Sequence, residues 1–304
     1  MDIENIDTST VFTNMIEVVN NPLGHRLPWM EKMRYQTLGT LEVISEQNSY
    51  SPGGSKMRQV LALLLVNANT VVGTEAIIDE LWKNDPPRSV TTTLQTYIYQ
   101  LRKAFKREFP DENIGDILIT HAPGYKLRIP LDRIDATGFE KSAREGRALF
   151  DDGRYADAQD RFASALSLWQ GEFMENVTRG RRLHSHAVLL EELKIETLQL
   201  KIAAEMRLGR NHEVISELRS LTEHHPLNEW FYGQLMCALA RAGRRGEALH
   251  VYQRLRYKLN SDLGLDPSAE IKRLHVEILN DEEGIRGVDS SSISVLDIAA
   301  IGRS

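Results

Sequence analysis

The chain has 304 residues, of which 41% are hydrophobic, and a formal net charge of −6 from 37 Lys and Arg against 43 Asp and Glu. This length and composition suit two domains with buried cores, and the acidic average does not by itself indicate a nucleic-acid partner. The single cysteine, Cys237, excludes an internal disulfide framework, and its apolar surroundings favour a buried structural thiol in a reducing compartment. No apolar run approaches the roughly 18 residues of a membrane-spanning helix, and the acidic N-terminus lacks the features of a secretory signal. We therefore expect a cytoplasmic protein that makes no membrane contact.

The first elements in chain order indicate a small mixed domain. Residues 1–32 have weak patterning and are interpreted as an N-terminal extension. Alternating apolar residues over 33–50 predict a short antiparallel sheet. An apolar helix is expected over 56–68, and Thr74 is expected to cap a second helix that runs to Trp82. The sequence Asp85-Pro86-Pro87 then requires an irregular loop.

The stretch from Ser89 to Arg107 predicts an amphipathic helix. Apolar residues recur every three or four positions, and the interval Arg88–Arg107 holds five Lys or Arg and no acid. A β-rich segment, Ile117–Ile129, follows and is broken by Pro123-Gly124, which indicates a hairpin. A basic helix with Thr and Gln on its polar face, followed by a hairpin, is typical of a winged helix that places the helix in the major groove. Residues 33–131 are therefore expected to form a winged-helix DNA-binding domain.

From Asp132 onward the pattern is helical and repetitive. Gly-Arg occurs at 153–154, 209–210 and 243–244, and the last two pairs are 34 residues apart, which is the tetratricopeptide period. The same apolar frame follows each Gly-Arg, so three stacked helix pairs are predicted, with an insertion that lengthens the helix near 184–208. We expect an all-α repeat domain over 132–283 and a flexible tail over 284–304. The predicted fold class is thus mainly α, with a winged helix-turn-helix followed by a tetratricopeptide-like domain.

At this point the sequence resembles the Streptomyces antibiotic regulatory protein family, which joins an OmpR-type winged helix to a bacterial transcriptional activation domain. The resemblance covers about residues 34–280. It rests on the segments LGTLEV (38–43), KMRQVLALLLVNANTVV (56–72), TLQTYIYQLRKAF (93–105), APGYKL (122–127) and HPLNEWFYGQLMCALARAGRRGEALHVYQRLRYKL (225–259). Residues 172–188 are poorer in small apolar residues than the family pattern, and no nucleotide-binding ATPase module is present.

The resemblance implies a set of DNA contacts. Thr96, Gln100 and Lys103 match the positions through which OmpR-type recognition helices contact bases, where Gln can bond adenine and the Thr methyl can touch thymine. The flanking residues, expected to contact phosphates, are Thr92, Thr93, Tyr99 and Arg102. At the start of the 56–68 helix and in the wing, the expected backbone contacts are Lys56, Arg58, His121, Tyr125 and Lys126. For each residue a solvated surface role stays open, and Arg102 has the alternative of pairing with an acid inside the domain.

The resemblance also implies how transcription is activated. Two protomers would bind double-stranded DNA in tandem, on direct repeats that overlap a promoter's −35 region. They would recruit RNA polymerase holoenzyme through region 4 of its sigma factor. The target genes would belong to a secondary-metabolite (antibiotic) biosynthetic cluster. The loop Lys83–Ser89 is expected to face the polymerase, through Lys83, Asp85, Pro86, Pro87 and Arg88. A simple connecting turn is the alternative for this loop.

Other functions remain open to different degrees. The segment SPGGSKMR (51–58) lacks the full phosphate-binding loop pattern, so an enzyme that cradles phosphate is disfavoured, and the nine scattered histidines suggest no metal site. We expect no enzymatic activity and no cofactor. The serious alternatives are a repressor of the same fold and a tetratricopeptide-type scaffold that binds proteins without any role in transcription.

Overall fold

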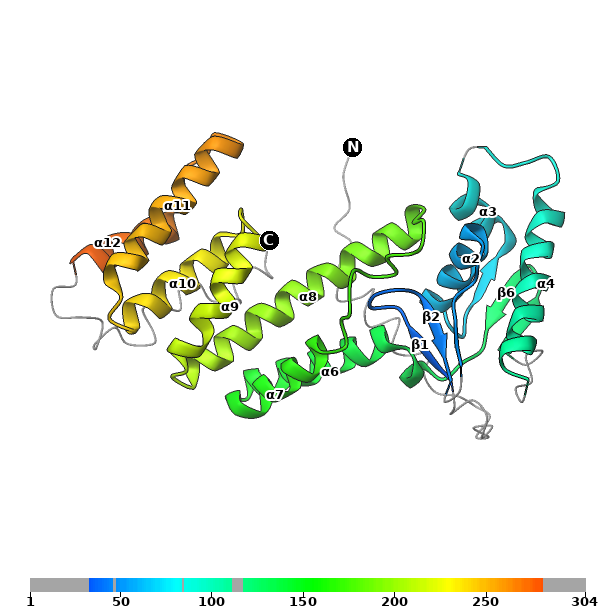
Figure 1. The fold of residues 1–304 in the computed structure, drawn as a ribbon, viewed down its shortest axis with the longest axis horizontal. Helices are drawn as coiled ribbons and strands as arrows, with labels where there is room; N and C mark the ends of the chain where they lie inside the picture. Colours follow the sequence, from blue (N-terminus) through cyan, green and yellow to red (C-terminus); the bar gives the residue numbers. More distant parts are fainter. Residues whose placement is uncertain (1–32, 46–47, 84, 111–116, 281–304) are drawn as a thin grey trace.

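The computed structural model describes residues 33–45, 48–83, 85–110 and 117–280. The predicted N-terminal extension (1–32) and the predicted tail (284–304) lie outside these residues. Figure 1 shows an elongated molecule with a mixed α/β region at one end, a helical array at the other, and the long helix α8 running between them. The mainly helical fold class, with small sheets at the N-terminal end, is confirmed.

The first sheet forms where alternation predicted it. Strands β1 (Arg34–Gln36), β2 (Glu42–Ile44) and β3 (Ser49–Tyr50) pair antiparallel in the order β1-β2-β3. The side chains of Tyr35 and Val43 lie opposite each other and are buried, so one face of this sheet covers the core.

Three helices and a second sheet complete the mixed region. Helices α2 (Ser55–Val66), α3 (Thr74–Trp82) and α4 (Val90–Glu108) precede the hairpin formed by β5 (Leu118–His121) and β6 (Gly124–Leu127).

A third strand, β4 (Val71–Gly73), pairs with β6 and gives the sheet order β4-β6-β5. The sequence analysis missed β4 because a three-residue strand is too short to show an alternation. The helix before it ends at Val66, and Asn69, at φ 65°, turns the chain toward the strand.

The expected cap at Thr74 was wrong. Gly73 occupies the N-cap position of α3 without a side-chain bond, and Thr74 is the first helical residue. The Thr74 amide and hydroxyl instead donate to the carbonyl of Pro123, at 3.1 and 2.9 Å. Thr74 therefore fixes the tip of the hairpin against the start of α3.

The helical region contains the three pairs that the repeat predicted. They are α6 (Asp135–Asp151) with α7 (Tyr155–Leu166), α8 (Arg181–Arg207) with α9 (Asn211–His224), and α10 (Glu229–Arg241) with α11 (Arg245–Leu263), followed by α12 (Ala269–Asn280). A short 3-10 turn, Leu131–Arg133, leads into α6. Gly153, Gly209 and Gly243 join the helices of each pair at φ of 75°, 78° and 74°, a left-handed conformation that favours glycine.

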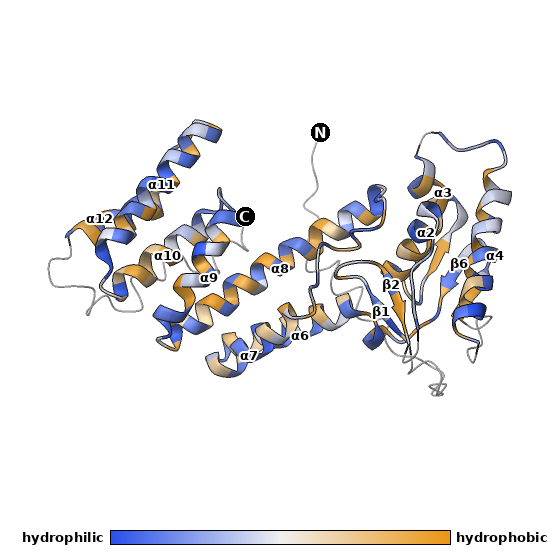
Figure 2. Cartoon of the chain, viewed as in Figure 1, coloured by the Kyte–Doolittle hydropathy of each residue, from blue (hydrophilic) through white to orange (hydrophobic). Residues whose placement is uncertain are grey.

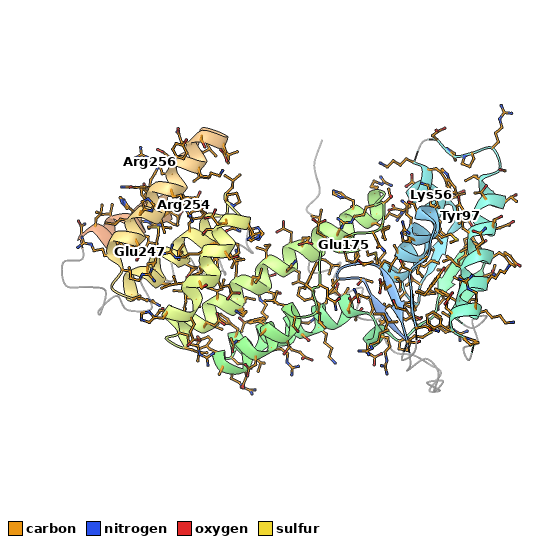
Figure 3. All side chains as sticks on the ribbon, viewed as in Figure 1. Lys56, Tyr97, Glu175, Glu247, Arg254 and Arg256 are labelled. Atoms are coloured by element: carbon orange, nitrogen blue, oxygen red, sulfur yellow. The ribbon has the colours of Figure 1, made fainter. Side chains whose placement is uncertain are left out.

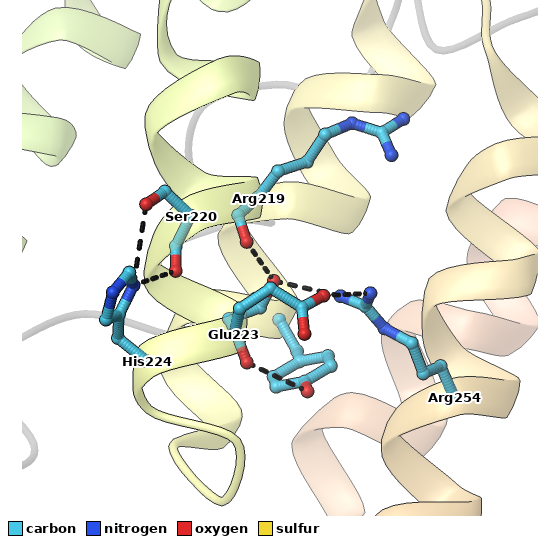
Figure 4. Close-up of polar contacts among 7 residues, drawn as sticks. Arg219, Ser220, Glu223, His224 and Arg254 are labelled. Atoms are coloured by element: carbon cyan, nitrogen blue, oxygen red, sulfur yellow. Dashed lines mark hydrogen bonds and ion pairs between the residues drawn. The ribbon is translucent and has the colours of Figure 1, made fainter.

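The last two pairs are tied together by a polar cluster. The Arg254 guanidinium of α11 lies 2.5 Å from Glu223 and donates to the Thr222 hydroxyl at 2.9 Å (Figure 4). The Tyr232 hydroxyl of α10 donates to the Thr222 carbonyl at 3.2 Å. These bonds link α9, α10 and α11.

The buried apolar residues form two main cores, and the division between them falls inside α8. One core extends from Met33 to Leu190 and combines the mixed region with α6 and the first half of α8, while the other extends from Ile202 to Ile278. Orange stretches along the inner sides of the helices in Figure 2 mark these apolar faces. The predicted boundary at residues 131 and 132 therefore lies within one continuous core.

The single cysteine of the chain lies in the helical region. Cys237 is buried in the second core, and burial raises the pKa of its thiol to about 12.

In the part of the chain that the structure describes, none of the helices combines the length and apolar character that crossing a bilayer requires.

Candidate nucleic-acid interface

Helix α4 is held by an apolar face that is completely covered. Leu94, Ile98, Leu101 and Phe105 are at most 1% exposed, and they recur at the three- and four-residue spacing of a helix face. The opposite face is open to solvent. A rigid backing of this kind fixes the positions of the exposed side chains relative to the rest of the domain.

The exposed face of α4 presents the residues that were expected to contact bases. Thr96, Gln100 and Lys103 lie at i, i+4 and i+7 and are all exposed, and Tyr99 beside them is 64% exposed. The Thr96 hydroxyl donates to the Thr92 carbonyl at 2.9 Å. Within the described ranges, no hydrogen bond or ion pair engages the side chains of Gln100 and Lys103, which leaves their polar groups available.

The residues expected to flank this face differ from one another. Thr92 is exposed, whereas the hydroxyl of the half-buried Thr93 donates to the Ser89 carbonyl at 3.0 Å. Arg102 is also half-buried and donates to the Leu118 carbonyl at 2.7 and 3.0 Å and to the Thr120 hydroxyl at 2.9 Å. Arg102 thus pairs with strand β5 rather than with an acid, and it joins α4 to the hairpin.

The wing is a tight hairpin whose turn is Ala122-Pro123. Gly124 allows β4 to approach, because a Cβ at this position would lie 1.9 Å from the Val72 carbonyl oxygen. His121 is exposed and Lys126 is half-buried. The expectation that Tyr125 is a surface residue of the wing was wrong, since its side chain is only 9% exposed and belongs to the first core.

Lys56 and Arg58 have partners inside the protein. The Lys56 ammonium donates to the Leu81 carbonyl at the end of α3 and lies 5.6 Å from the centre of the Trp82 ring; partial burial lowers its pKa. Arg58 donates to the carbonyls of Asn176 and Pro52 at 2.9 and 2.8 Å. The Lys56 ammonium and the Arg58 guanidinium are therefore both engaged by backbone carbonyls around α2, which leaves them less available to a phosphate.

The loop between α3 and α4 projects from the end of the molecule (Figure 1). The side chains of Lys83, Asp85, Pro86, Pro87 and Arg88 are exposed. Beside the loop, the ring of Trp82 at the end of α3 stacks on the ring of Tyr97 in α4, with centroids 6.2 Å apart and an interplanar angle of 16°. Figure 3 shows Lys56 and Tyr97 together at this end of the molecule.

A second group of polar residues was not found by sequence reasoning, and it joins the mixed region to the helical region. Glu80 of α3 is 1% exposed, and its carboxylate accepts from the amides of Arg182 and Leu183, at 2.8 and 3.2 Å, in the first turn of α8. A carboxylate at a helix N-terminus satisfies free amides and interacts favourably with the helix dipole. Gly180 allows this approach, because a Cβ there would lie 2.4 Å from the Glu80 carbonyl oxygen.

The same junction is fixed at two other points. The Asp135 carboxylate of α6 accepts from the amides of Thr37 and Leu38, at 2.8 to 3.0 Å. The Asn176 side-chain oxygen accepts from the Leu41 amide at 2.8 Å. No local pattern reveals such bonds, because the partners are 97 or more residues apart in the chain.

Comparisons with known proteins agree with this architecture. Residues 52–127 match the family described as "Transcriptional regulatory protein, C terminal", and residues 134–279 match "Bacterial transcriptional activator domain". The chain is similar to the regulatory protein DnrI of Streptomyces peucetius, with 37% identity over 83% of this chain and 94% of DnrI. The chain belongs to the Streptomyces antibiotic regulatory protein family.

Two further similarities extend the comparison. The transcriptional regulator RedD of Streptomyces coelicolor is 33% identical over 80% of this chain and 70% of RedD. A solved structure of Mycobacterium tuberculosis EmbR in complex with a low-affinity phosphopeptide superposes with a TM-score of 0.78 at 30% identity, covering 88% of this chain and 69% of that one. The family therefore identifies the protein as a transcriptional regulator with an OmpR-like winged helix.

Proposed function

We propose that this regulator is an activator that binds direct repeats near a promoter's −35 region and recruits RNA polymerase through region 4 of the sigma factor. Its targets would be the genes of a secondary-metabolite (antibiotic) biosynthetic cluster, and it would act in the cytoplasm as a dimer on DNA. The observation that carries the proposal is the exposed face of α4, where the side chains of Gln100 and Lys103 are unpaired beside the exposed Thr96 on a helix with a buried back.

This face suits the major groove for chemical reasons. A Gln amide can donate to and accept from adenine, and a Lys ammonium can donate to guanine, so the two side chains can discriminate between base pairs. Lys106 near the end of α4 is exposed and adds positive charge for phosphates, whereas the neighbouring Arg107 is paired with Glu108 at 2.6 Å. His121 and Lys126 of the wing would contact the flanking backbone.

The α3–α4 loop supports the recruitment step. Its residues are exposed, and the Trp82–Tyr97 stack joins α3 to α4 beside it. The sequence Asp85-Pro86-Pro87 is conformationally restricted, so a partner that binds it loses little loop entropy. The loop ends where α4 begins, and the residues proposed to contact bases lie further along that helix, so we infer that DNA and polymerase could be bound together.

The proposal is tested by a gel shift with promoter fragments taken upstream of genes adjacent to the regulator's own gene, with and without RNA polymerase holoenzyme. We expect salt-sensitive binding, two protomers for each pair of repeats, and tighter binding when holoenzyme is present. A complex that excludes the polymerase would identify a repressor instead. If the protein binds none of the fragments in a salt-sensitive way, the result would contradict DNA binding and support the protein-binding scaffold.

A further inference from the structure

A pocket of about 610 Å³ lies between the α7–α8 connection and the middle of α8, away from the recognition face and the α3–α4 loop. Leu166, Leu198 and the Trp169 indole give it apolar walls. Trp169 is held from behind by Phe139, with ring centroids 5.4 Å apart at 86°. The Lys194 ammonium lies 4.1 Å from the centre of the Trp169 ring.

The cations that line this pocket are more buried than the acids beside them. The side chains of Arg179 and Lys194 are 26% and 28% exposed, whereas Glu172 and Glu191 beside them are 80% and 42% exposed. Both ion pairs measure 3.9 Å, which is longer than a hydrogen bond. The Arg179 guanidinium also donates to the Phe173 carbonyl, which holds the side chain in place without neutralising its charge. The pocket therefore keeps a positive charge that the two acids compensate only weakly.

We propose that this pocket binds a small organic anion with a flat apolar body. The anionic group would lie between Arg179 and Lys194, and the body would pack against Trp169, Leu166 and Leu198. Apolar walls with a few convergent polar groups are the usual construction of small-molecule sites, and a partly desolvated cation–anion contact is stronger than an exposed one.

The position of the pocket connects its occupancy to the winged helix. The connection that forms one wall also donates from the amides of Gln170 and Met174 to the carbonyls of Leu38 and Thr37, at 2.8 Å each. The helix that forms the other wall begins at the Glu80 carboxylate. Both walls are therefore elements that hold the winged helix, and an occupant would change the stability of these backbone bonds.

The site is tested on the full chain by fluorescence titration with 8-anilino-1-naphthalenesulfonate, an aromatic sulfonate. We expect saturable binding with one probe per chain. Lys194→Gln and Arg179→Gln should each raise the dissociation constant by about tenfold, which corresponds to about 1.4 kcal/mol. The matched control Lys141→Gln, at a side chain that is 72% exposed on α6, should leave it unchanged. Equal affinities in all four proteins would overturn the proposal.

Two other probes separate charge from apolar contact. The neutral analogue N-phenyl-1-naphthylamine should bind more weakly and be insensitive to Lys194→Gln, and inorganic phosphate should displace the sulfonate only weakly. An uncharged probe that binds as tightly as the sulfonate would reduce the site to a general apolar surface. Full displacement by phosphate would reduce it to a site for simple anions, and either result would overturn the proposal.

The connection to the winged helix is tested by amide hydrogen exchange, which requires no knowledge of the operator. We expect the sulfonate to slow exchange at Gln170 and Met174, and at Arg182 and Leu183 in the first turn of α8, relative to the same protein without probe. The Lys194→Gln variant should lose this protection. Protection confined to residues that line the pocket would show that the site exists but does not reach the junction, and would refute the connection.

Discussion

The proposed recognition face of α4, formed by Thr96, Gln100 and Lys103, and the junction between the winged helix and the helical region are both rich in polar side chains. They differ in how those side chains are used. On α4, Gln100 and Lys103 stand exposed and unpaired within the described residues. At the junction, Glu80 and Asp135 are engaged by backbone amides from distant parts of the chain. A polar group without a partner on a rigid surface is available to a ligand, whereas a polar group satisfied inside the protein stabilises the architecture.

Arg58 illustrates why this distinction matters. In the sequence it resembles Lys103, since each is a basic residue on a helix of the winged-helix domain. The structure directs the Arg58 guanidinium to the carbonyl of Asn176 in the helical region. Residue type and helix position alone could not separate the two roles.

The largest expected effect is at the junction. Replacing Glu80 by Ala removes a buried carboxylate and leaves two amides of the first turn of α8 without an acceptor, so we expect a loss of about 2–4 kcal/mol of unfolding free energy. Urea denaturation measures this. The control Glu75→Ala, at an exposed residue of the same helix, should cost less than about 1 kcal/mol. Equal losses in both variants would contradict the role assigned to Glu80.

The next effect is on the recognition face. Gln100→Ala and Lys103→Ala should each weaken operator binding by roughly 1–3 kcal/mol, with little change in unfolding free energy. Titrations of operator DNA at fixed salt measure the affinity. Gln253→Ala and Lys141→Ala, at exposed positions of α11 and α6, are the matched controls. Operator affinity that stays unchanged in both recognition-face variants would show that bases are read elsewhere.

A variant at Arg58 tests the comparison directly. Arg58→Ala removes hydrogen bonds to two carbonyls, and we expect it to lower the unfolding free energy by about 1–2 kcal/mol. If Arg58 makes no phosphate contact, the salt dependence of operator binding should keep its slope. A slope reduced by about one would instead restore Arg58 as a DNA contact.

The α3–α4 loop should affect transcription without affecting DNA affinity. Asp85→Arg reverses the charge of an exposed side chain in this loop, so we expect unchanged operator affinity and reduced transcription in vitro with purified holoenzyme. The variant Glu75→Arg, at an exposed residue at the start of α3, is the matched control. Full activation by Asp85→Arg would remove this loop from the proposed polymerase contact.

The smallest expected effect concerns the thiol of Cys237. Because its pKa is raised to about 12, the native thiol should react very slowly with a disulfide reagent near neutral pH and rapidly after unfolding. Since the folded pKa lies above the unfolded one, the unfolded state loses the proton first, and stability should fall as the pH rises above about 9. Rapid labelling of the native protein would contradict the burial of this thiol.

The sequence by itself determined the elements whose signals are local. The spacing of Leu94, Ile98, Leu101 and Phe105 predicts the buried face of α4, and burial of all four confirms it. The Gly-Arg turns predict three helix pairs because the residues that pack within a pair recur at short, regular intervals. These features depend on neighbours a few residues apart, so they can be read without knowledge of the fold.

Only the tertiary structure decided which polar side chains remain available. Strand β4 is visible only through its pairing with β6, and Tyr125 turned inward because that sheet covers the core. The amide donor to Glu80 and the carbonyl acceptor of Arg58 lie 102 and 118 residues away along the chain. A hydrogen bond between such distant groups is set by how the domains pack, because local periodicity carries no information about a partner that only folding brings into contact.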